Sequence, residues 1–249
     1  MHYLCKIMEE RLDKILVQRN FVETRVKAEK IIQEVGVKVF GKLITKPGKK
    51  FAVDCKIELV AQDLDWTSIE SLKLVESISK WDLEIKDKKF LDIGILNGAF
   101  TEVLLKYNAK KVYSLNPIKD SGISSYEGDE RIVDFSGKFL RELTSNNITD
   151  EIDGCVIDEP TLSMDKILPF IHPFLKVNSF VIAVIKPQLE VTKENLKNNG
   201  SVRNTLGYTE MFEILKKVGL TNNLNYIDHI DSPIIGKEGQ EFIILFRKQ

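Results

Sequence analysis

The sequence predicts a doubly wound α/β domain with a mostly parallel sheet, preceded by a small α+β domain. Three observations lead to this prediction. From residue 67 onward, short apolar runs that suit buried strands alternate with helical patterns, which is typical of parallel sheets. One of these strands is joined to its helix by a glycine-containing loop. Basic residues are concentrated at the start: residues 1–50 hold 12 Lys and Arg against 6 Asp and Glu, and the rest of the chain holds 24 against 31.

Residues 1–60 are expected to form the small domain, and residues 61–66 a polar linker. Apolar spacing favours helices at 11–17 and 24–34, the second with Thr24 as its N-cap. Short strands are expected at 37–40, 43–45 and 56–60. A basic surface on so small a domain favours a polyanion as its partner, although a solvated lysine-rich face would have the same composition.

Residues 67–249 are expected to form the α/β domain. Thr67 and Glu70 have the spacing of a capping box for a helix that ends near Lys80. The short connection at 232–240 predicts that the last strand runs antiparallel to its neighbour as a hairpin. The elements between them are a strand at 90–93, a glycine loop at 94–98, a helix at 99–106, strands at 111–115 and 131–133, a strand ending at 158, a helix at 162–175, a strand at 179–185, a helix at 210–218, and strands at 225–230 and 241–246.

Four ionisable side chains are expected at one edge of this sheet, where the carboxyl ends of parallel strands meet and ligands bind. Asp158 and Lys186 each end a strand there. Glu241 begins the antiparallel last strand, and Lys73 lies in the first turns of a helix that runs antiparallel to the first strand, so both reach the same edge. Each residue alone could be a helix cap or a solvated charge, but the convergence of two lysines and two acids beside the glycine loop favours a catalytic set.

These residue types suit the activation of a weakly acidic hydroxyl group. Burial and a second ammonium group make a lysine easier to deprotonate. We therefore expect Lys186 to accept the proton of a ribose 2′-OH and Lys73 to stabilise the developing oxyanion. Asp158 and Glu241 are expected to hold the two lysines in place. The oxygen would then attack an electrophilic methyl group held in line by the glycine loop, with N–H groups of the following helix facing the ligand.

The composition argues against two other kinds of site. Cysteine and histidine, three of each, share no ligand spacing, so no metal site is expected. The cysteines are few and far apart, which favours free thiols in a cytoplasmic protein. The longest apolar run, 180–185, is far shorter than the roughly 18–20 residues that a membrane-spanning helix needs, so no membrane partner is expected.

The small domain resembles an S4 RNA-binding domain. The matching residues are Arg11-Leu12-Asp13, Thr24-Arg25 with Lys27-Ala28, and Val37-Lys38-Val39-Phe40-Gly41-Lys42. The resemblance implies that the domain docks on structured RNA through phosphate contacts, which position a protein without reading much sequence. The residues expected to contact RNA are Arg11, Arg25, Lys27, Lys38 and Lys42, together with Arg203 in the α/β domain.

The α/β domain resembles the FtsJ-like 2′-O-methyltransferases, and nearly the whole chain resembles the TlyA family, in which an S4 domain precedes such a domain. The matching segments are Asp92-Ile93-Gly94 with Gly98-x-Phe100-Thr101, Ile185-Lys186-Pro187-Gln188-x-Glu190, Gly200-x-Val202-Arg203, and Ser232-Pro233-Ile234-x-Gly236-x-x-Gly239-x-Glu241-Phe242. The resemblance implies a Rossmann-like methyltransferase fold, S-adenosylmethionine as cofactor, and ribosomal RNA in ribosomal subunits as partner, methylated at cytidine 2′-hydroxyls. The family's K-D-K-E tetrad falls on Lys73, Asp158, Lys186 and Glu241, and its cofactor site implies Asp92, Gly94, Asn97, Gly98, Phe100 and Asn116.

Several residues depart from the family pattern. Leu96 and Ala99 stand where the family has serine and glycine, and Asn116 replaces the acid that usually ends the second strand and binds ribose hydroxyls. The motif Ser-Arg-Gly-Gly-x-Lys-Leu reads Ser-Ile-Glu-Ser-Leu-Lys-Leu at 68–74, which removes an arginine and adds Glu70. We interpret the chain as a divergent methyltransferase. The alternatives are an RNA-binding relative that no longer catalyses and, because family members are often labelled hemolysin, a membrane-active protein.

Overall fold

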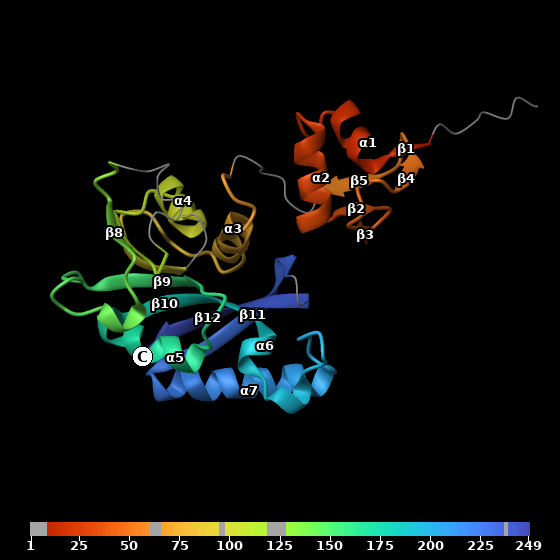
Figure 1. Cartoon of the computed structure of the whole chain (residues 1–249). Coiled ribbons are helices and arrows are strands. Elements are labelled where there is room, and N and C mark those ends of the chain that lie inside the picture. The colour runs from red at the N-terminus through yellow and green to blue at the C-terminus, as the bar shows by residue number, and fades with distance from the viewer. Residues whose placement is uncertain (1–8, 60–65, 95–97, 119–127, 237–238) are drawn as a thin grey trace, which may run out of the picture. The chain divides into compact units, whose positions relative to one another are not determined.

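The structure is a computed structural model that describes residues 9–59, 66–94, 98–118, 128–236 and 239–249 (Figure 1). The chain divides into two compact units, residues 1–65 and 66–249. The predicted linker at 61–66 lies outside the described residues except for Trp66, and so do Leu96 and Asn97 of the glycine loop.

The N-terminal unit has the small α+β fold that the sequence predicts. Its antiparallel sheet β3-β2-β5 packs against α1 and α2 through buried residues such as Leu12 and Ile32. Thr24 caps α2 as expected, because its hydroxyl accepts a hydrogen bond from the backbone N of Lys27 at 3.2 Å. No pattern predicts the pairing of β1 with β4, since a strand of three charged residues has no apolar alternation. The elements are β1 (Glu9–Arg11), α1 (Leu12–Gln18), α2 (Arg25–Glu34), β2 (Val37–Val39), β3 (Lys42–Ile44), β4 (Lys50–Ala52) and β5 (Ile57–Leu59).

The second unit contains a seven-stranded sheet in the order β11-β12-β10-β9-β6-β7-β8. β12 is antiparallel to both of its neighbours and the other neighbouring pairs are parallel, which confirms the predicted doubly wound sheet with an antiparallel last strand. The strands are β6 (Lys89–Gly94), β7 (Lys111–Asn116), β8 (Ile132–Ser136), β9 (Ile152–Asp158), β10 (Leu175–Ile185), β11 (Leu224–Gly236) and β12 (Gly239–Lys248). The helices are α3 (Ser71–Lys80), α4 (Ala99–Lys106), α5 (Met164–Ile171), α6 (Pro187–Glu190) and α7 (Thr205–Thr221), with 3₁₀ turns at Leu140–Glu142, His172–Phe174 and Lys193–Asn195.

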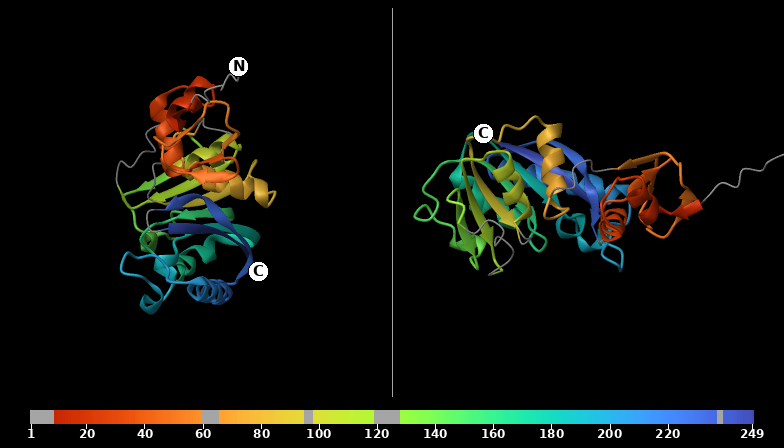
Figure 2. Two further views of the ribbon diagram at one scale, coloured as in Figure 1. Left: turned by 90° about the vertical axis from the view of Figure 1, so that its right-hand side faces the viewer. Right: turned by 90° about the horizontal axis from the view of Figure 1, so that it is seen from above.

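Helices cover both faces of this sheet because successive strand residues point to opposite faces. Phe90 of β6 belongs to a buried cluster with residues of α3 and α4, whereas the next residue, Leu91, belongs to a cluster with residues of α5 and α7. Figure 1 shows α3 and α4 above the sheet and α5 and α7 below it, and Figure 2 shows the sheet from two further sides. Because the helices lie on the two faces, a site can form at the carboxyl edge of the parallel strands.

Helices differ from the prediction at their ends, and α7, expected at 210–218, spans Thr205–Thr221. The predicted capping box is wrong: α3 begins at Ser71, and the side chain of its N-cap residue Glu70 makes no capping hydrogen bond. The backbone N and the hydroxyl of Thr67 instead donate to the Glu102 carboxylate, at 3.0 and 3.3 Å. The helix expected at 162–175 ends at residue 171 and continues as a 3₁₀ turn that contains a proline, which cannot donate a helical hydrogen bond.

Candidate active site

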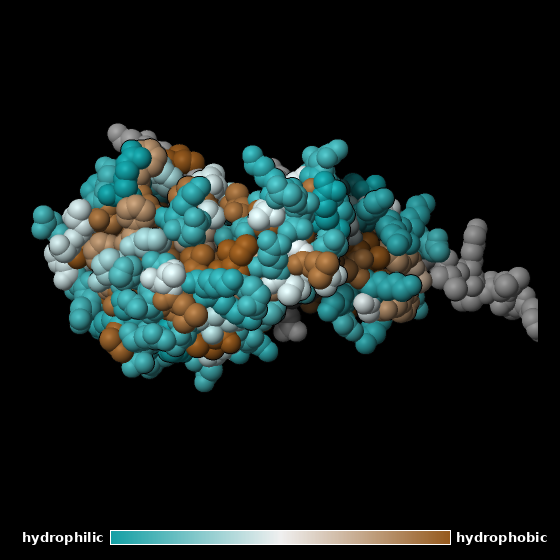
Figure 3. Space-filling view, turned by 90° about the horizontal axis from the view of Figure 1, so that it is seen from below, coloured by the Kyte–Doolittle hydropathy of each residue, from teal (hydrophilic) through white to brown (hydrophobic). Residues whose placement is uncertain are grey.

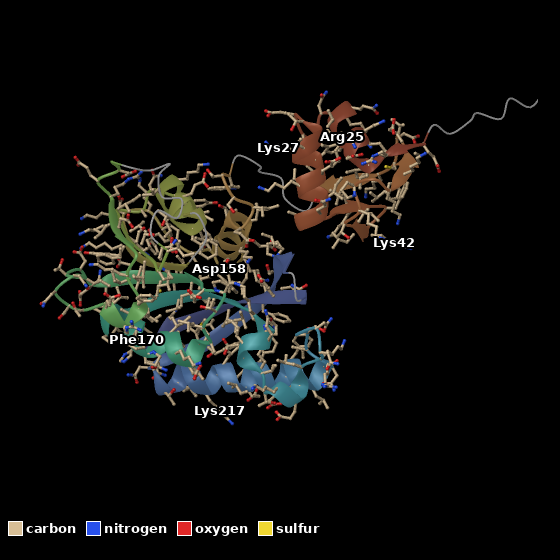
Figure 4. All side chains as sticks on the ribbon, in the orientation of Figure 1. Arg25, Lys27, Lys42, Asp158, Phe170 and Lys217 are labelled. Carbon is tan, nitrogen blue, oxygen red and sulfur yellow. The ribbon has the colours of Figure 1, made fainter. Side chains whose placement is uncertain are left out.

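A buried cluster of charged side chains lies at the carboxyl edge of the sheet, around Asp158 (labelled in Figure 4). Asp158 accepts hydrogen bonds from two lysines, at 3.1 Å from Lys73 Nζ to Oδ2 and at 2.9 Å from Lys186 Nζ to Oδ1. Lys73 Nζ also lies 2.7 Å from Glu241 Oε2. The structure therefore brings together the four side chains that sequence topology places at this edge.

The sheet explains why these side chains meet. Asp158 is the last residue of β9 and pairs in register with Gly94 of β6. Lys186 follows β10 and directly precedes a proline, so its backbone is kept extended. Glu241 lies near the start of β12, where Gly236 of the neighbouring strand leaves room for it. A Cβ atom at position 236 would lie 2.6 Å from Glu241 Oε1.

Burial and charge pairing fix the protonation of the cluster. The side chain of Lys73 is 3% exposed and that of Asp158 4%. Burial lowers the pKa of Lys73, but the carboxylates around it raise the pKa more, so it lies well above its ordinary value and the group remains an ammonium. Burial raises the pKa of Asp158, but the two lysines lower it more, so Asp158 remains a carboxylate. Burial also raises the pKa of Glu241, and Lys73 offsets this only in part.

Glu70 is a fifth member of the cluster, at a position where the sequence pattern predicts a helix cap. Its Oε2 lies 2.5 Å from Lys73 Nζ, and its side chain is 25% exposed. Acid and base three residues apart on a helix face each other, so the spacing could have indicated this ion pair. Glu70 also satisfies the capping-box pattern, in which its partner would be the backbone N–H of Thr67 rather than Lys73. Lys73 is therefore surrounded by three carboxylates rather than the two that the sequence predicts.

A cleft beside the cluster lies between the glycine loop and the ends of β6 and β7. The empty space in and above it, open solvent included, is about 330 Å³, and its lining includes Glu70 and Asp158. Gly98 has φ 67°, a left-handed conformation that favours glycine, and directly precedes α4. A Cβ atom at Gly94 would lie 3.2 Å from the carbonyl oxygen of Asp158, so glycine lets the two strand ends approach closely. Asn97 lies outside the described residues, and the other residues predicted to bind a cofactor all line the cleft: Asp92, Gly94, Gly98, Phe100 and Asn116.

Hydrogen bonds that the sequence does not predict hold two of these cleft residues. The Thr101 hydroxyl donates to Asp92 Oδ2 at 2.6 Å and lies 3.4 Å from the Ser114 hydroxyl. Burial raises the pKa of Asp92 to about 6, although the Thr101 hydrogen bond lowers it. Asn116 is buried, and its Oδ1 accepts a hydrogen bond from the backbone N of Ile118 at 2.9 Å. An amide oxygen has a second lone pair, so Asn116 can still accept a bond from a ligand hydroxyl.

Two of the arginines predicted to contact RNA share a buried partner. Asp13 Oδ2 lies 2.6 Å from Arg11 Nη2 and 3.0 Å from Arg25 Nε, and the Asp13 side chain is fully buried. The arginine side chains are still 36% and 51% exposed. They therefore connect α1 with α2 and at the same time present charge to solvent. In the sequence Asp13 stands out only as part of the Arg-Leu-Asp motif, and in the structure it is the buried partner of both arginines.

The remaining basic residues come from different elements of the two units. Lys27 on α2 is half-buried, whereas Lys38 and Lys42 on the β2–β3 hairpin are exposed. Figure 4 labels Lys27 beside Arg25 and Lys42 on the hairpin. Arg203 is exposed in the second unit, where its Nε donates to a backbone carbonyl oxygen at 2.6 Å.

A doubly wound sheet whose antiparallel β12 lies between β10 and β11, with a cleft and a lysine–carboxylate cluster at its carboxyl edge, defines a Rossmann-like protein of the methyltransferase class. The chain belongs to the FtsJ-like methyltransferase family, whose model matches residues 67–249. The S4 domain model matches residues 10–53, so the resemblance of the small domain is confirmed as well.

Relatives that match most of this chain carry two kinds of name. Hemolysin A of Brachyspira hyodysenteriae is 29% identical over 92% of this chain and 95% of its own length. The 16S/23S rRNA (cytidine-2′-O)-methyltransferase TlyA of Mycobacterium tuberculosis is 27% identical over 77% of this chain and 72% of its own length. A solved structure of a hemolysin-named protein from Streptococcus thermophilus has a TM-score of 0.73 at 26% identity, over 98% of this chain and 90% of that one. The predicted resemblance to the TlyA family is thereby confirmed.

The apolar residues of the described chain bear on whether the protein could interact with a membrane. None of the helices in the described part of the chain is long and apolar enough to cross a bilayer. On the face in Figure 3, hydrophobic residues lie in separate patches among hydrophilic ones. Exposed apolar side chains such as Leu206 and Leu220, at opposite ends of α7, are of the kind that ordinary protein surfaces carry.

Proposed function

We propose that this protein is an S-adenosylmethionine-dependent methyltransferase that methylates the 2′-hydroxyl of cytidine in ribosomal RNA. The observation that carries the proposal is the position of Asp158, which holds Lys73 and Lys186 on its two oxygens beside the cleft. Such a pair of lysines suits the deprotonation of an alcohol and the stabilisation of its oxyanion. The names of the TlyA relatives supply the substrate class.

The cleft residues fit the parts of the proposed cofactor. Gly94 and Gly98 provide backbone that a ligand can approach closely, and the N-terminus of α4 offers N–H groups. Asn116 can accept a hydrogen bond from a ribose hydroxyl. Asp158 and Glu70 border the cleft on the side of the charged cluster and favour a cationic sulfonium there.

The two lysines have different surroundings, and this difference supports different roles for them. Lys73 is paired with three carboxylates, whereas Lys186, whose side chain is 11% exposed, forms its ion pair with Asp158. If Lys186 loses its proton, Asp158 is still neutralised by Lys73. If Lys73 lost its proton, Lys186 would be the one cation left in the cluster to balance three largely buried carboxylates. Such uncompensated buried negative charge is unfavourable. Lys186 is therefore the base, and Lys73 is the permanent cation.

These roles account for the methyl group, the proton and the electron pair in the proposed methyl transfer. S-adenosylmethionine held by cleft residues such as Gly94 and Asn116 would supply an electrophilic methyl group, and the electron pair of the broken carbon–sulfur bond would stay on its sulfur. Lys186, as the free amine, accepts the 2′-OH proton while the ribose oxygen forms the new bond to carbon. The Lys73 ammonium stabilises the negative charge on that oxygen, and Asp158 orients both lysines. Exposed bases of the S4 domain, such as Lys42, hold the RNA through its phosphates.

The test is transfer of a labelled methyl group from S-adenosylmethionine to purified ribosomal subunits, followed by mapping of the modified nucleotide. The proposal expects label on the 2′-oxygen of a cytidine, and saturable binding of the cofactor in a calorimeter. The uncharged Asn116 and the additional Glu70 favour a second candidate, an RNA-binding relative without catalysis. RNA binding with no heat of cofactor binding at millimolar concentration would support that second function and contradict the first.

A further inference from the structure

An aromatic side chain occupies a strained and exposed position on the β2–β3 hairpin of the S4 domain. Val39 pairs with Lys42, so the loop between the strands consists of Phe40 and Gly41. Both residues have positive φ, 52° and 75°, as two-residue hairpin loops of the type I′ kind require. Asparagine or aspartate followed by glycine is the usual pair in such a loop, because a bulky residue is rarely found at positive φ.

Within the described residues, the ring of Phe40 takes no part in the packing of this unit. The residue is 66% exposed, and it is absent from the buried cluster of this unit and from the partly buried residues packed against it. Exposure of a phenylalanine ring to water and a left-handed backbone are both unfavourable. Strain of this kind persists mainly where a side chain has a function that the fold does not need.

The surroundings of Phe40 indicate what the ring would contact. Lys38 and Lys42 on the flanking strands are exposed, so the hairpin presents positive charge on both sides of the aromatic tip. Lysines hold nucleic acid phosphates, and an aromatic ring stacks on any base that is not already stacked between its neighbours. Proteins recognise RNA largely at such loops and bulges, where bases can be splayed out.

We propose that Phe40 is a stacking platform for an unpaired base of the RNA, and that Lys38 and Lys42 hold the phosphates on either side of it. This inference rests on the proposed RNA substrate and adds a ligand class, a nucleobase outside a duplex, to the S4 surface. A less stable hairpin loop is the consequence of placing an exposed aromatic ring at a position with positive φ.

The test compares two RNA probes: a stem-loop with an unpaired loop of about six nucleotides, and a blunt duplex with the same stem. Because one stacked base contributes roughly one to two powers of ten in affinity, Phe40→Asn is expected to weaken stem-loop binding about ten-fold and to leave duplex binding unchanged. The salt dependence should not change, since no phosphate contact is lost. Phe40→Trp should retain stem-loop affinity within about three-fold.

Two controls separate stacking from other causes. Asparagine is tolerated at positive φ, so Phe40→Asn should fold with an equal or higher melting temperature, and lost binding cannot be attributed to misfolding. Val26→Gln removes an apolar side chain that is 76% exposed on α2, and it should leave stem-loop affinity unchanged. Three results would overturn the proposal. Phe40→Asn could bind the stem-loop as tightly as the wild type, it could lose as much affinity for the duplex as for the stem-loop, or the wild type could bind neither probe.

The same measurements keep the two proposals apart. If the wild type methylates ribosomal RNA but Phe40→Asn binds the stem-loop normally, the stacking proposal fails and the proposed function stands. If Phe40→Asn binds the stem-loop weakly but the wild type transfers no methyl group to any ribosomal subunit, the proposed function fails and the stacking proposal stands.

Discussion

The ammonium group of Lys73 and the carboxylate of Glu241 meet at 2.7 Å, although one lies on the first helix of the α/β unit and the other on its last strand. The Glu241 carboxylate can occupy this position because residue 236 is a glycine, which has no side chain. A Cβ atom at Gly236 would lie 2.6 Å from Glu241 Oε1, so any other residue there must displace the acid. The backbone of Gly236 is not in the left-handed region, which means that space rather than conformation requires glycine.

We expect Gly236→Ala to lower the rate of methyl transfer by about ten-fold or more, because a displaced Glu241 no longer fixes Lys73. The melting temperature should change by only a few degrees, since the strand backbone tolerates alanine. Steady-state kinetics with labelled cofactor measures the rate. Combining Gly236→Ala with the shorter acid of Glu241→Asp should recover part of the loss, and strictly additive losses would contradict the steric explanation.

Lys186→Ala is expected to reduce methyl transfer on the order of 10²–10⁴-fold, the usual contribution of a general base. RNA and cofactor affinities should stay within about two-fold, because the base acts on the hydroxyl in the transition state rather than on either ligand in the ground state. Filter binding and calorimetry provide the two affinities. Lys193→Ala, which removes an exposed lysine seven residues further along the chain, is the matched control and should be neutral. Persistent activity of Lys186→Ala would show that another group is the base.

Glu70→Gln is expected to move the acid limb of the pH–rate profile to lower pH. The sign follows from charge: removing one of the three carboxylates around Lys73 makes the cluster less negative, so a proton leaves it more easily. The base must lose its proton to act, so the active form is then reached at lower pH. Glu76→Gln, on the exposed side of the same helix, should leave the profile unchanged. A shift to higher pH would contradict this view of Glu70.

The edge of the sheet at which the site lies could be predicted because strand ends obey topology. Parallel strands end at the same edge whatever their side chains pack against, so Asp158 and Lys186 could be placed together from sequence. The ion pair between Glu70 and Lys73, at the start of helix α3, could not be predicted. Glu70 satisfies two local patterns, and the choice between them depends on Glu102 of another helix, which binds Thr67 and removes the cap.

The network in the N-terminal unit was beyond prediction for a similar reason. The sequence presents Arg11 and Arg25 as surface bases, and nothing in its periodicity indicates that one buried acid accepts bonds from both. That acid, Asp13, lies among apolar residues of α1, where a pattern-based reading expects only the polar face of a helix. A buried charge becomes favourable through contacts that form only after two helices have packed.

Asp13→Asn is expected to destabilise the N-terminal unit by about 2 kcal/mol, because buried charge-assisted hydrogen bonds from two arginines are weakened. The hydrogen bonds from Arg11 outweigh burial and hold the pKa of Asp13 well below its usual range. Its stabilisation is therefore fully present above the unfolded-state pKa and is lost progressively as the pH falls from there through the lower, folded-state pKa. Hydrogen exchange of the α1 and α2 amides between pH 3 and 7 measures both effects. Asp54→Asn, an exposed acid of the same unit, should have no effect on either.

Asn116→Asp is expected to increase affinity for S-adenosylmethionine by about three- to ten-fold, because a charge-assisted bond to a ribose hydroxyl is roughly twice as strong as a neutral one. Asn116 lines the cleft and is buried, so the new carboxylate would be shielded from water and its bond to the ligand would not be screened. The backbone N–H of Ile118, which now donates to the amide oxygen, would donate to the carboxylate equally well. Calorimetric titration at pH 7.5 measures the dissociation constant, with the exposed Asn108→Asp as a charge-matched control. Weaker binding by Asn116→Asp than by the wild type would place the ribose elsewhere in the cleft.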